Sequence, residues 1–245
     1  TLIITPQPDW KWSDGNVTLL TQREGYYQTI RIYSDNTTFI RLHLGPTYES
    51  EMSITTREPN FGYARNMVDA TGNVGGKHVL VIGGAGHSMA RALENRGAIV
   101  TEVEIDPIVA ELSTEFFGPI SGDVIIQDGR AYVETAETDS FDYVLIDAFN
   151  GPQSIPAQLT TLEFFESVDR ILKPDGVMVM NFIGQLSGPR SGSFTAMAAT
   201  ISAAFNYASY WGSGNILFLA SESDMVGFNV TESPSDGQVL TDNLN

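Results

Sequence analysis

The sequence predicts an α/β protein in which a doubly wound, mostly parallel sheet follows a small N-terminal β domain. Short strand-like segments separated by turn residues fill the first part of the chain, and strands alternate with helices from Lys77 onward. No apolar run approaches the roughly 18 residues that span a bilayer. We expect domains at residues 1–60 and 61–221, followed by a polar tail at residues 222–245.

The composition narrows the class of partner. In 245 residues, 30 Asp and Glu oppose 13 Lys and Arg, which gives a formal net charge of −17. Nucleic acid is not an expected partner, because phosphate contacts need Lys and Arg. The chain has no cysteine, and its three histidines lack metal-ligand spacing, so no metal is assigned. We favour a well-hydrated surface as the meaning of the acidity, with attraction of a cationic substrate as the alternative.

The N-terminal domain is expected to contain three strands, at Val17–Thr21, Tyr27–Tyr33 and Thr38–Leu44. In the second of them, larger side chains alternate with their neighbours at the strand period of two. Clusters of Ser, Asp and Asn between the segments predict turns. A helical stretch at Phe61–Ala70 then leads into the second domain.

The second domain begins with the apolar strand His78–Ile82 and a glycine-rich turn. A helix is expected at Ser88–Arg96, with Gly97 at its C-terminal cap. After the strand Ala98–Glu104, Asp106 can cap the next helix, and the proline that follows it suits a first helical turn.

The remaining elements continue this alternation. Strands are expected at Asp123–Gln127 and Phe141–Asp147, with a short helix between them. Thr160–Glu163 has capping-box spacing before a helix that ends at Lys173–Gly176. The domain is completed by a strand at Val177–Phe182, a helix at Ser193–Phe205, and strands at Ala208–Trp211 and Ile216–Ala220.

Ligands of such sheets bind at the carboxyl ends of the strands. Gly83, Gly84 and Gly86 follow the first parallel strand, where small residues let a ligand approach the backbone. Glu104 ends the next strand about 20 residues later, where a carboxylate can accept both hydroxyls of a ribose. Together they favour a nucleoside-binding site. The alternative is that the glycines only form a tight turn and that Glu104 only caps a loop.

Carboxylates also follow the next two strands. Asp128 and Gly129 could meet the edge and face of an adenine. Asp147 comes directly after an apolar run and should stand at the mouth of the pocket. There it could hold and deprotonate an ammonium nucleophile or anchor a cationic group, and its alternative role is to cap the following loop.

These residues resemble the spermidine synthase (polyamine aminopropyltransferase) family. The resemblance spans roughly residues 17–220 and rests on Tyr27–Ile30, Val79–Gly84, Val103–Pro107, Asp128–Arg130 and Asp147. It implies a Rossmann-like class I methyltransferase fold behind an N-terminal β domain, and a homodimer. It also implies transfer of an aminopropyl group from decarboxylated S-adenosylmethionine, used as a co-substrate without a metal, to a small amine.

The resemblance also assigns roles to individual residues. Gln28 would touch the tail of the cofactor, Glu104 its ribose, and Asp128 with Gly129 its adenine. Asp147 would take the place of the catalytic Asp. The other residues matched to the family site are Gly83, Gly84, Gly86 and Asp106 on the cofactor side, and Tyr63, Asn150 and Trp211 on the amine side.

A closer likeness is to spermidine synthase-like domains fused to a multi-helix membrane segment. It is carried by Asp147–Gly151, Ile155-Pro156, Leu159–Phe165 and Tyr63–Met67. A chain that begins at Thr1 without Met would suit the soluble part of such a fusion. The expected location is therefore cytoplasmic, either free or as the soluble domain of a membrane-anchored protein.

Three positions depart from the family pattern. Gly86 stands where the family has an Asp that grips the free amine of the cofactor, and Asn150 stands where the catalytic loop has a second Asp. Arg65 replaces a Glu near the expected diamine. Each change removes an opposite charge from a dication, so the nucleoside half of the site is expected to be intact and the polyamine half altered. Putrescine is therefore not the expected natural acceptor.

Three functions remain open from the sequence. The first is aminopropyl transfer to an amine, with Asp147 as the base. The second is methyl transfer from intact S-adenosylmethionine, which the missing loop carboxylate favours. The third is a non-catalytic nucleoside-binding sensor joined to a membrane partner.

Overall fold

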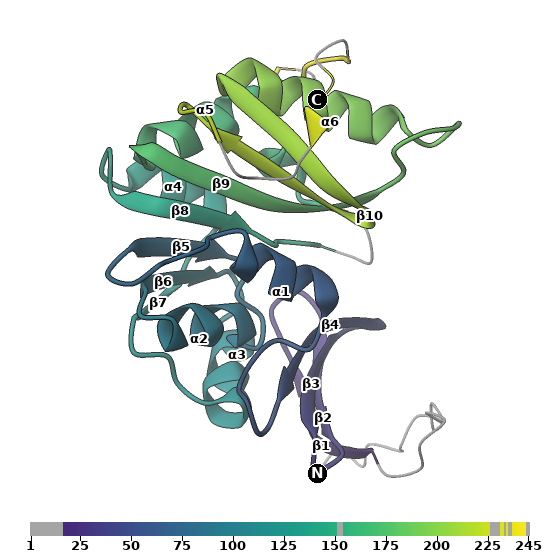
Figure 1. The fold of residues 1–245 in the computed structure, drawn as a ribbon. Coiled ribbons are helices and arrows are strands. Elements are labelled where there is room, and N and C mark those ends of the chain that lie inside the picture. The colour runs from purple at the N-terminus through teal and green to yellow at the C-terminus, as the bar shows by residue number, and fades with distance from the viewer. Residues whose placement is uncertain (1–16, 151–153, 226–230, 233, 235–236, 244–245) are drawn as a thin grey trace.

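The computed structural model describes residues 17–150, 154–225, 231, 232, 234 and 237–243 (Figure 1). It contains a four-stranded antiparallel sheet followed by a seven-stranded sheet with helices on both faces, so the predicted fold class is confirmed. Residues 1–16 of the predicted N-terminal domain, Gly151 of the catalytic-loop motif and much of the predicted tail lie outside the described residues.

The N-terminal sheet has the strand order β1-β2-β3-β4, and every neighbouring pair is antiparallel. Its strands are β1 (Thr18–Glu24), β2 (Thr29–Ser34), β3 (Phe39–Leu44) and β4 (Thr47–Ser53). The sequence predicted the first three and missed β4. The buried positions of β4 include the polar Ser50 and Glu51, so the strand lacks a regular alternation of apolar and polar residues.

Strand β4 pairs irregularly with β3. Leu42 lies opposite Ser50, whereas the next residue, His43, lies opposite Tyr48. Glu49 is therefore the extra residue of a β-bulge, a feature that redirects side chains and often lies beside active sites.

The second sheet has the strand order β11-β10-β9-β8-β5-β6-β7. Pairing is parallel from β7 to β9, and β10 and β11 add antiparallel strands at one side. The chain builds β6 and β7 on one side of β5 and then β8 on the other, so strand order reverses between β5 and β8. The strands are β5 (His78–Ile82), β6 (Ile99–Glu104), β7 (Asp123–Ile126), β8 (Phe141–Ile146), β9 (Leu172–Gly184), β10 (Tyr207–Ser221) and β11 (Thr231–Glu232).

Two strands differ from their predicted extent. The strand expected at Val177–Phe182 runs from Leu172 to Gly184, and its pairing with β8 is broken around the Lys173–Gly176 segment that was predicted as a turn. The two strands expected at Ala208–Trp211 and Ile216–Ala220 form the single strand β10. The intervening glycines mark an irregular backbone in this strand rather than its end, with Gly212 at φ 101° and Gly214 at φ 80°.

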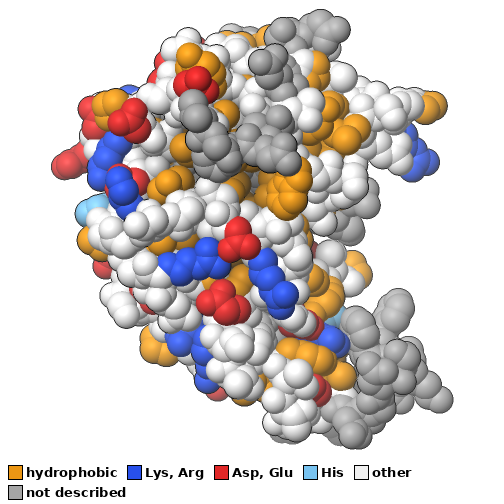
Figure 2. All heavy atoms as spheres, in the orientation of Figure 1, with side chains coloured by type: hydrophobic (Ala, Val, Ile, Leu, Met, Phe, Trp, Pro, Cys, Tyr) orange, Lys and Arg blue, Asp and Glu red, His pale blue; other side chains and the backbone are white. Residues whose placement is uncertain are grey.

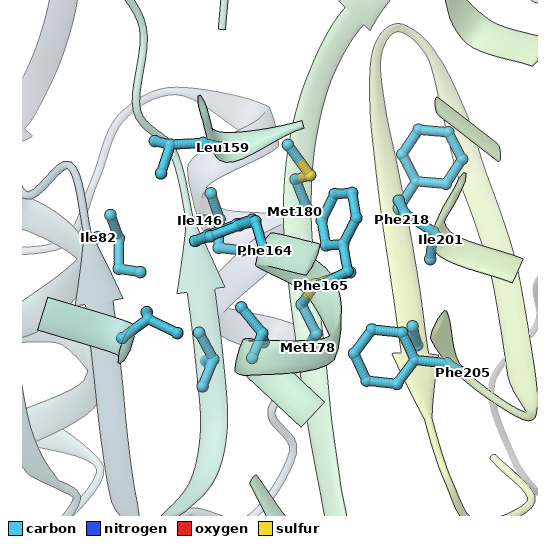
Figure 3. Close-up of a cluster of buried hydrophobic side chains, with 14 of the residues drawn as sticks. Ile82, Ile146, Leu159, Phe164, Phe165, Met178, Met180, Ile201, Phe205 and Phe218 are labelled. Atoms are coloured by element: carbon cyan, nitrogen blue, oxygen red, sulfur yellow. The ribbon is translucent and has the colours of Figure 1, made fainter. Parts of the chain in front are cut away.

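Alternating side chains bury both faces of this sheet. On β5, Val79 and Val81 pack with α1 (Gly62–Asp69) and α2 (Ser88–Asn95). Leu80 and Ile82 belong to the opposite core, which is closed by α4 (Gly129–Thr135), α5 (Leu162–Ile171) and α6 (Gly192–Ala204). Figure 3 shows this second core, with Phe164 and Phe165 of α5 among the strand side chains. A third core joins the N-terminal sheet to α3 (Pro107–Leu112) and to the π-helical turn Ser113–Phe117 that continues it.

The helix caps agree with those predicted from the sequence, with one exception. After α2, the Gly97 N–H bonds to the Glu94 carbonyl and the Ala98 N–H to the Leu93 carbonyl, the pair of bonds that ends a helix at a left-handed glycine. Asp106 caps α3 as predicted. The cap of α5 is Thr161, which accepts the N–H of Phe164, rather than Thr160 as the capping-box spacing suggested.

Charge is mixed on the face in Figure 2, where acidic and basic side chains lie next to one another. Some of the opposite charges form ion pairs, such as Arg96–Asp69 (2.8 Å) between the ends of α2 and α1. Within the part of the chain that the structure describes, no helix is both long and apolar enough to cross a membrane.

Candidate active site

A cavity of about 400 Å³ lies at the carboxyl ends of the parallel strands and is also lined by residues of the N-terminal sheet. That size and position are typical of a small-molecule site in an open α/β sheet. Nine of the twelve predicted site residues line it: Gln28, Tyr63, Gly83, Glu104, Asp106, Asp128, Gly129, Asp147 and Asn150.

Four neighbouring strand ends bring these residues together. Gly83 follows β5, Glu104 ends β6, Asp128 follows β7, and Asp147 follows β8. Because β8, β5, β6 and β7 lie side by side in that order and run parallel, their carboxyl ends meet at one edge of the sheet. Gly83 and Asp147 flank the position where strand order reverses.

Gly83 is required by space as well as by conformation. Its φ is +86°, and a Cβ at this position would lie 2.5 Å from the backbone oxygen of Asp147. The Gly83 N–H also bonds to the Val103 carbonyl (3.0 Å), so the backbone cannot easily shift. The glycine therefore lets the turn after β5 pack against the loop that follows β8.

Replacing Gly83 by Ala is expected to lower the free energy of unfolding by about 2 kcal/mol or more, because backbone strain and a backbone clash add. Gly72→Ala is the matched control, since Gly72 has φ +59° but no atom within 4 Å of its added Cβ. Urea unfolding of both variants measures the difference. Equal destabilisation of the two proteins would contradict the close approach of Gly83 to Asp147.

Gly84 and Gly86 lie outside the cavity lining. A Cβ on Gly84 would overlap the Glu102 side chain, and a Cβ on Gly86 would lie 2.6 Å from Ser50 Oγ. Beneath the turn, His87 Nδ1 lies 2.5 Å from Glu102 Oε1, and both side chains are buried. These contacts indicate that the two glycines allow close packing of the turn against β6 and β4.

Glu104 and Asp106 have different surroundings. Glu104 Oε1 accepts the N–H of Asp106 (2.9 Å), and burial raises the pKa of the Glu104 carboxyl to about 7. Asp106 uses both oxygens on backbone groups: Oδ2 accepts the N–H of Tyr26 (2.7 Å) and Oδ1 that of Ile108 (2.9 Å). Asp106 therefore ties the β1–β2 turn, which carries Gln28, to the start of α3.

Asp128 caps α4 through Oδ1, which accepts the N–H of Ala131 (3.0 Å). Its Oδ2 accepts a longer hydrogen bond from Gln158 Nε2 (3.4 Å). Gly129 fits closely against β5, because a Cβ there would lie 2.6 Å from a methyl carbon of Ile82. Asp128 thus combines a capping role with a position in the cavity wall.

Asp147 is held by two side chains from different elements. Asn181 Nδ2 on β9 donates to Oδ1 (2.8 Å), and the Tyr63 hydroxyl on α1 donates to Oδ2 (3.3 Å). Burial raises the pKa of the Asp147 carboxyl to about 6, although both hydrogen bonds act to lower it. A carboxylate fixed in this way and with this pKa is suited to accept a proton near neutral pH.

Two residues of the site escaped the sequence prediction. Asn181 is buried and holds Asp147, and its signal was a single amide in the otherwise apolar run Val177–Phe182. Glu49 lines the cavity from β4, and burial, with a further contribution from the charge of Asp147, raises the pKa of its carboxyl to about 7. Glu49 gave no signal, because the strand that carries it was not predicted.

One residue matched to the amine side, Trp211, and the departure at Arg65 lie elsewhere. Trp211 is on β10, outside the cavity lining, with 44% of its surface exposed. Arg65 points its guanidinium toward the β4–α1 connection, where it donates to the Pro59 carbonyl (2.6 Å) and to Asn60 Oδ1 (2.7 Å). The reversed charge at position 65 is therefore directed away from the cavity. Among the described residues, no three His, Cys, Asp or Glu side chains are grouped to hold a metal ion.

Comparison with known proteins places this arrangement in context. The sequence is 37% identical over 151 residues to a polyamine aminopropyltransferase of Chromobacterium violaceum, covering 58% of this chain and 57% of that protein. It is 35% identical over 117 residues to an N-terminal histidine N-methyltransferase of Emericella nidulans, covering 46% of this chain and 21% of that protein. The chain thus spans about a fifth to three-fifths of the length of these two relatives.

The fold is also found in solved structures. A probable spermidine synthase from Corynebacterium glutamicum superposes with a TM-score of 0.79 at 21% identity, covering 92% of this chain and 97% of the other. Residues 60–210 match the spermine/spermidine synthase domain family, which is more than half of the chain and includes Asp147 and its two hydrogen-bond donors. The chain therefore belongs to the spermine/spermidine synthase family.

Proposed function

We propose that this chain transfers an aminopropyl group from decarboxylated S-adenosylmethionine to a small amine. The observation that carries the proposal is the placement of Asp147, held by Tyr63 and Asn181, in the same cavity as Glu104 and Asp128. The carboxylates at the ends of β6 and β7 are thus suited to a nucleoside, and the carboxylate at the end of β8 is suited to act as a base toward an amine. Membership of the family supports the same assignment.

The residues on the nucleoside side fit the proposed donor. Glu104 at the end of β6 can accept the ribose hydroxyls, because its side chain lines the cavity and each carboxylate oxygen can accept more than one hydrogen bond. Asp128 and Gly129 at the end of β7 would meet the adenine, and Gln28 would face the tail of the donor. Asp106 acts indirectly, since its Oδ2 holds the turn that carries Gln28 while its Oδ1 caps α3.

The proposed donor supplies a sulfonium carbon that is already activated by the positive charge on sulfur. The amine nitrogen forms a bond to that carbon, the carbon–sulfur bond breaks, and its electron pair stays on sulfur. Asp147 accepts the proton that the amine must lose, while Tyr63 and Asn181 fix its orientation. The proposed contribution of this chain to catalysis is therefore to position the amine against the sulfonium carbon and to supply one base.

We further propose that the acceptor site differs from that of the family. Asn150 lines the cavity without a carboxylate, and Arg65 is turned away from it. The acceptor would then be an amine other than putrescine. Dimerisation and a membrane segment outside this chain stay predictions.

A methyltransferase is the second candidate, and Gly86 favours it. No carboxylate at that position marks a decarboxylated donor, and a Cβ there would meet Ser50. The relative from Emericella nidulans is named a methyltransferase. Under this alternative, the same nucleoside residues would bind intact S-adenosylmethionine.

The nucleoside product separates these functions. The protein is incubated with each sulfonium donor and a panel of amines, and the product is identified by mass spectrometry. Methylthioadenosine is the expected product, and its absence with every amine contradicts aminopropyl transfer. S-adenosylhomocysteine would establish methylation, and binding without turnover would establish a sensor.

Activity is expected to fall on the acid side of neutrality. Burial raises the pKa of Glu104 to about 7 and that of Asp147 to about 6, and both carboxyls must be anionic to act. Glu49, whose pKa is also raised to about 7, and Tyr63 face the same region. Below pH 6, kcat/KM should drop by at least about tenfold per pH unit. A flat profile between pH 5 and 7 would rule out Asp147 as the base.

A further inference from the structure

We propose that Glu49 is a substrate-binding residue whose carboxylate binds the second, non-reacting ammonium group of a small diamine acceptor. The inference rests on the proposed function, because it assigns the reacting nitrogen of the same acceptor to Asp147. It names the acceptor class as a short diamine and places its second charge on the N-terminal sheet rather than in the catalytic loop.

The β-bulge directs Glu49 into the cavity. Its neighbours Tyr48 and Ser50 pair with consecutive residues of β3, so Glu49 has no partner across the strand pair. Its side chain lines the cavity together with Tyr63 and Asp147. The Tyr63 hydroxyl lies 3.4 Å from the backbone oxygen of Glu49 and 3.3 Å from Asp147 Oδ2, which connects the bulge to the catalytic carboxylate.

The Glu49 carboxylate lacks the partners that a structural carboxylate has. It makes no hydrogen bond or ion pair with any of the described residues, although most of its surface is covered. Glu51, two residues further along β4, provides the contrast: it is paired with Arg41 and also accepts hydrogen bonds from Tyr48 and Asn60. Glu51 therefore stabilises the fold, and Glu49 is left available to a ligand.

The electrostatics of the cavity favour a cationic ligand there. Glu49 and Asp147 both line the cavity, whereas no Lys, Arg or His is among the described residues that line it. Burial disfavours the ionised form of both side chains, and the charge of Asp147 disfavours ionisation of Glu49 further. A ligand with a positive charge at this position would relieve both effects.

The chemistry of the reaction distinguishes the two carboxylates. The reacting amine must lose a proton before it attacks, so its nitrogen is neutral when it approaches the sulfonium carbon and needs a base there rather than a permanent counter-ion. A second amine on the same molecule keeps its proton at neutral pH and does need a counter-ion. A diamine therefore uses both Asp147 and Glu49, whereas a monoamine uses Asp147 alone.

Paired acceptors test this assignment. With the wild-type protein, kcat/KM for 1,3-diaminopropane or 1,5-diaminopentane should exceed that for n-propylamine or n-pentylamine by about 10- to 100-fold, as one charge-assisted hydrogen bond would give. In Glu49→Gln that advantage should disappear, with the monoamines changed by less than about threefold and the Kd for methylthioadenosine unchanged. Glu49→Asp should keep part of the advantage, because it retains the charge on a shorter side chain.

Glu137→Gln is the matched control, since it removes the same charge from an exposed position outside the cavity. It should leave the preference for diamines intact. Equal losses for diamines and monoamines in Glu49→Gln, or no loss for either, would overturn the proposal. Thermal unfolding of each variant identifies any loss of folded protein.

Failure of aminopropyl transfer can be distinguished from failure of the Glu49 assignment. If the wild-type protein releases no methylthioadenosine with any amine, aminopropyl transfer is wrong, and the role of Glu49 is then measured by calorimetry. The same four amines are titrated into the protein saturated with methylthioadenosine. Diamine binding that weakens about 10-fold or more in Glu49→Gln supports the assignment. Undetectable diamine binding, or equal binding to both proteins, refutes it.

Discussion

Asp147→Asn is expected to lower kcat by about 10²- to 10⁴-fold, the usual contribution of a positioned general base. Asn has nearly the shape of Asp and can still contact Tyr63 and Asn181, the two residues that hold the carboxylate. It cannot accept the proton that the amine must release. Steady-state kinetics with the donor that proves active measures the loss.

Nucleoside binding separates loss of chemistry from loss of structure. Asp147 lies on the amine side of the cavity, so the Kd for methylthioadenosine in Asp147→Asn should stay within about twofold of the wild-type value. Asn181→Ala should have a smaller effect on kcat, because it removes one hydrogen bond to Asp147 but leaves the carboxylate. Full activity in Asp147→Asn would show that another group accepts the proton.

Glu104→Gln is expected to weaken methylthioadenosine binding by about 10²-fold. Two charge-assisted hydrogen bonds to ribose hydroxyls would be reduced to neutral ones, and bonds to charged groups are roughly twice as strong. Because Glu104 is nine-tenths buried and lines the cavity, water cannot fully replace what is lost. Calorimetric titration of the nucleoside above pH 8, where the carboxyl is ionised, gives the comparison.

The control for Glu104 is a ligand that lacks the ribose. Adenine has no ribose hydroxyls, so its Kd should change little in Glu104→Gln if the carboxylate contacts only those hydroxyls. A parallel loss of adenine and methylthioadenosine binding would indicate that the substitution disturbs the β6 end as a whole. Unchanged binding of both would place the ribose elsewhere.

The sequence was informative where function and regular structure coincide. Apolar residues dominate β5, β7 and β8, and acidic residues lie at the end of β6 or within two residues after β7 and β8. Glu104, Asp128 and Asp147 could therefore be assigned to one edge of one sheet from the sequence alone. Gly83 could be assigned as well, because the turn after a first strand requires close approach.

Residues that depend on tertiary contacts could not be found in this way. Glu49 sits in a bulge, and a bulge shifts the side-chain period by one residue, so no alternation marks its side chain as facing the cavity. Asn181 is functional only because β9 lies beside β8 and brings its amide to Asp147. Trp211 was matched by resemblance to a substrate-side tyrosine of the family, but β10 continues through the following glycines and places it outside the cavity.

The bulge in β4 also separates the proposed acceptor contact from the rest of the proposed site along the chain. The residues proposed for the ribose, the adenine and the base lie at strand ends of the parallel sheet, whereas Glu49 belongs to the hairpin formed by β3 and β4. Position 49 can therefore be substituted without a substitution at any strand end of the larger sheet. Acceptor preference is then open to engineering at one position, while the residues proposed for the alkylation step stay unchanged.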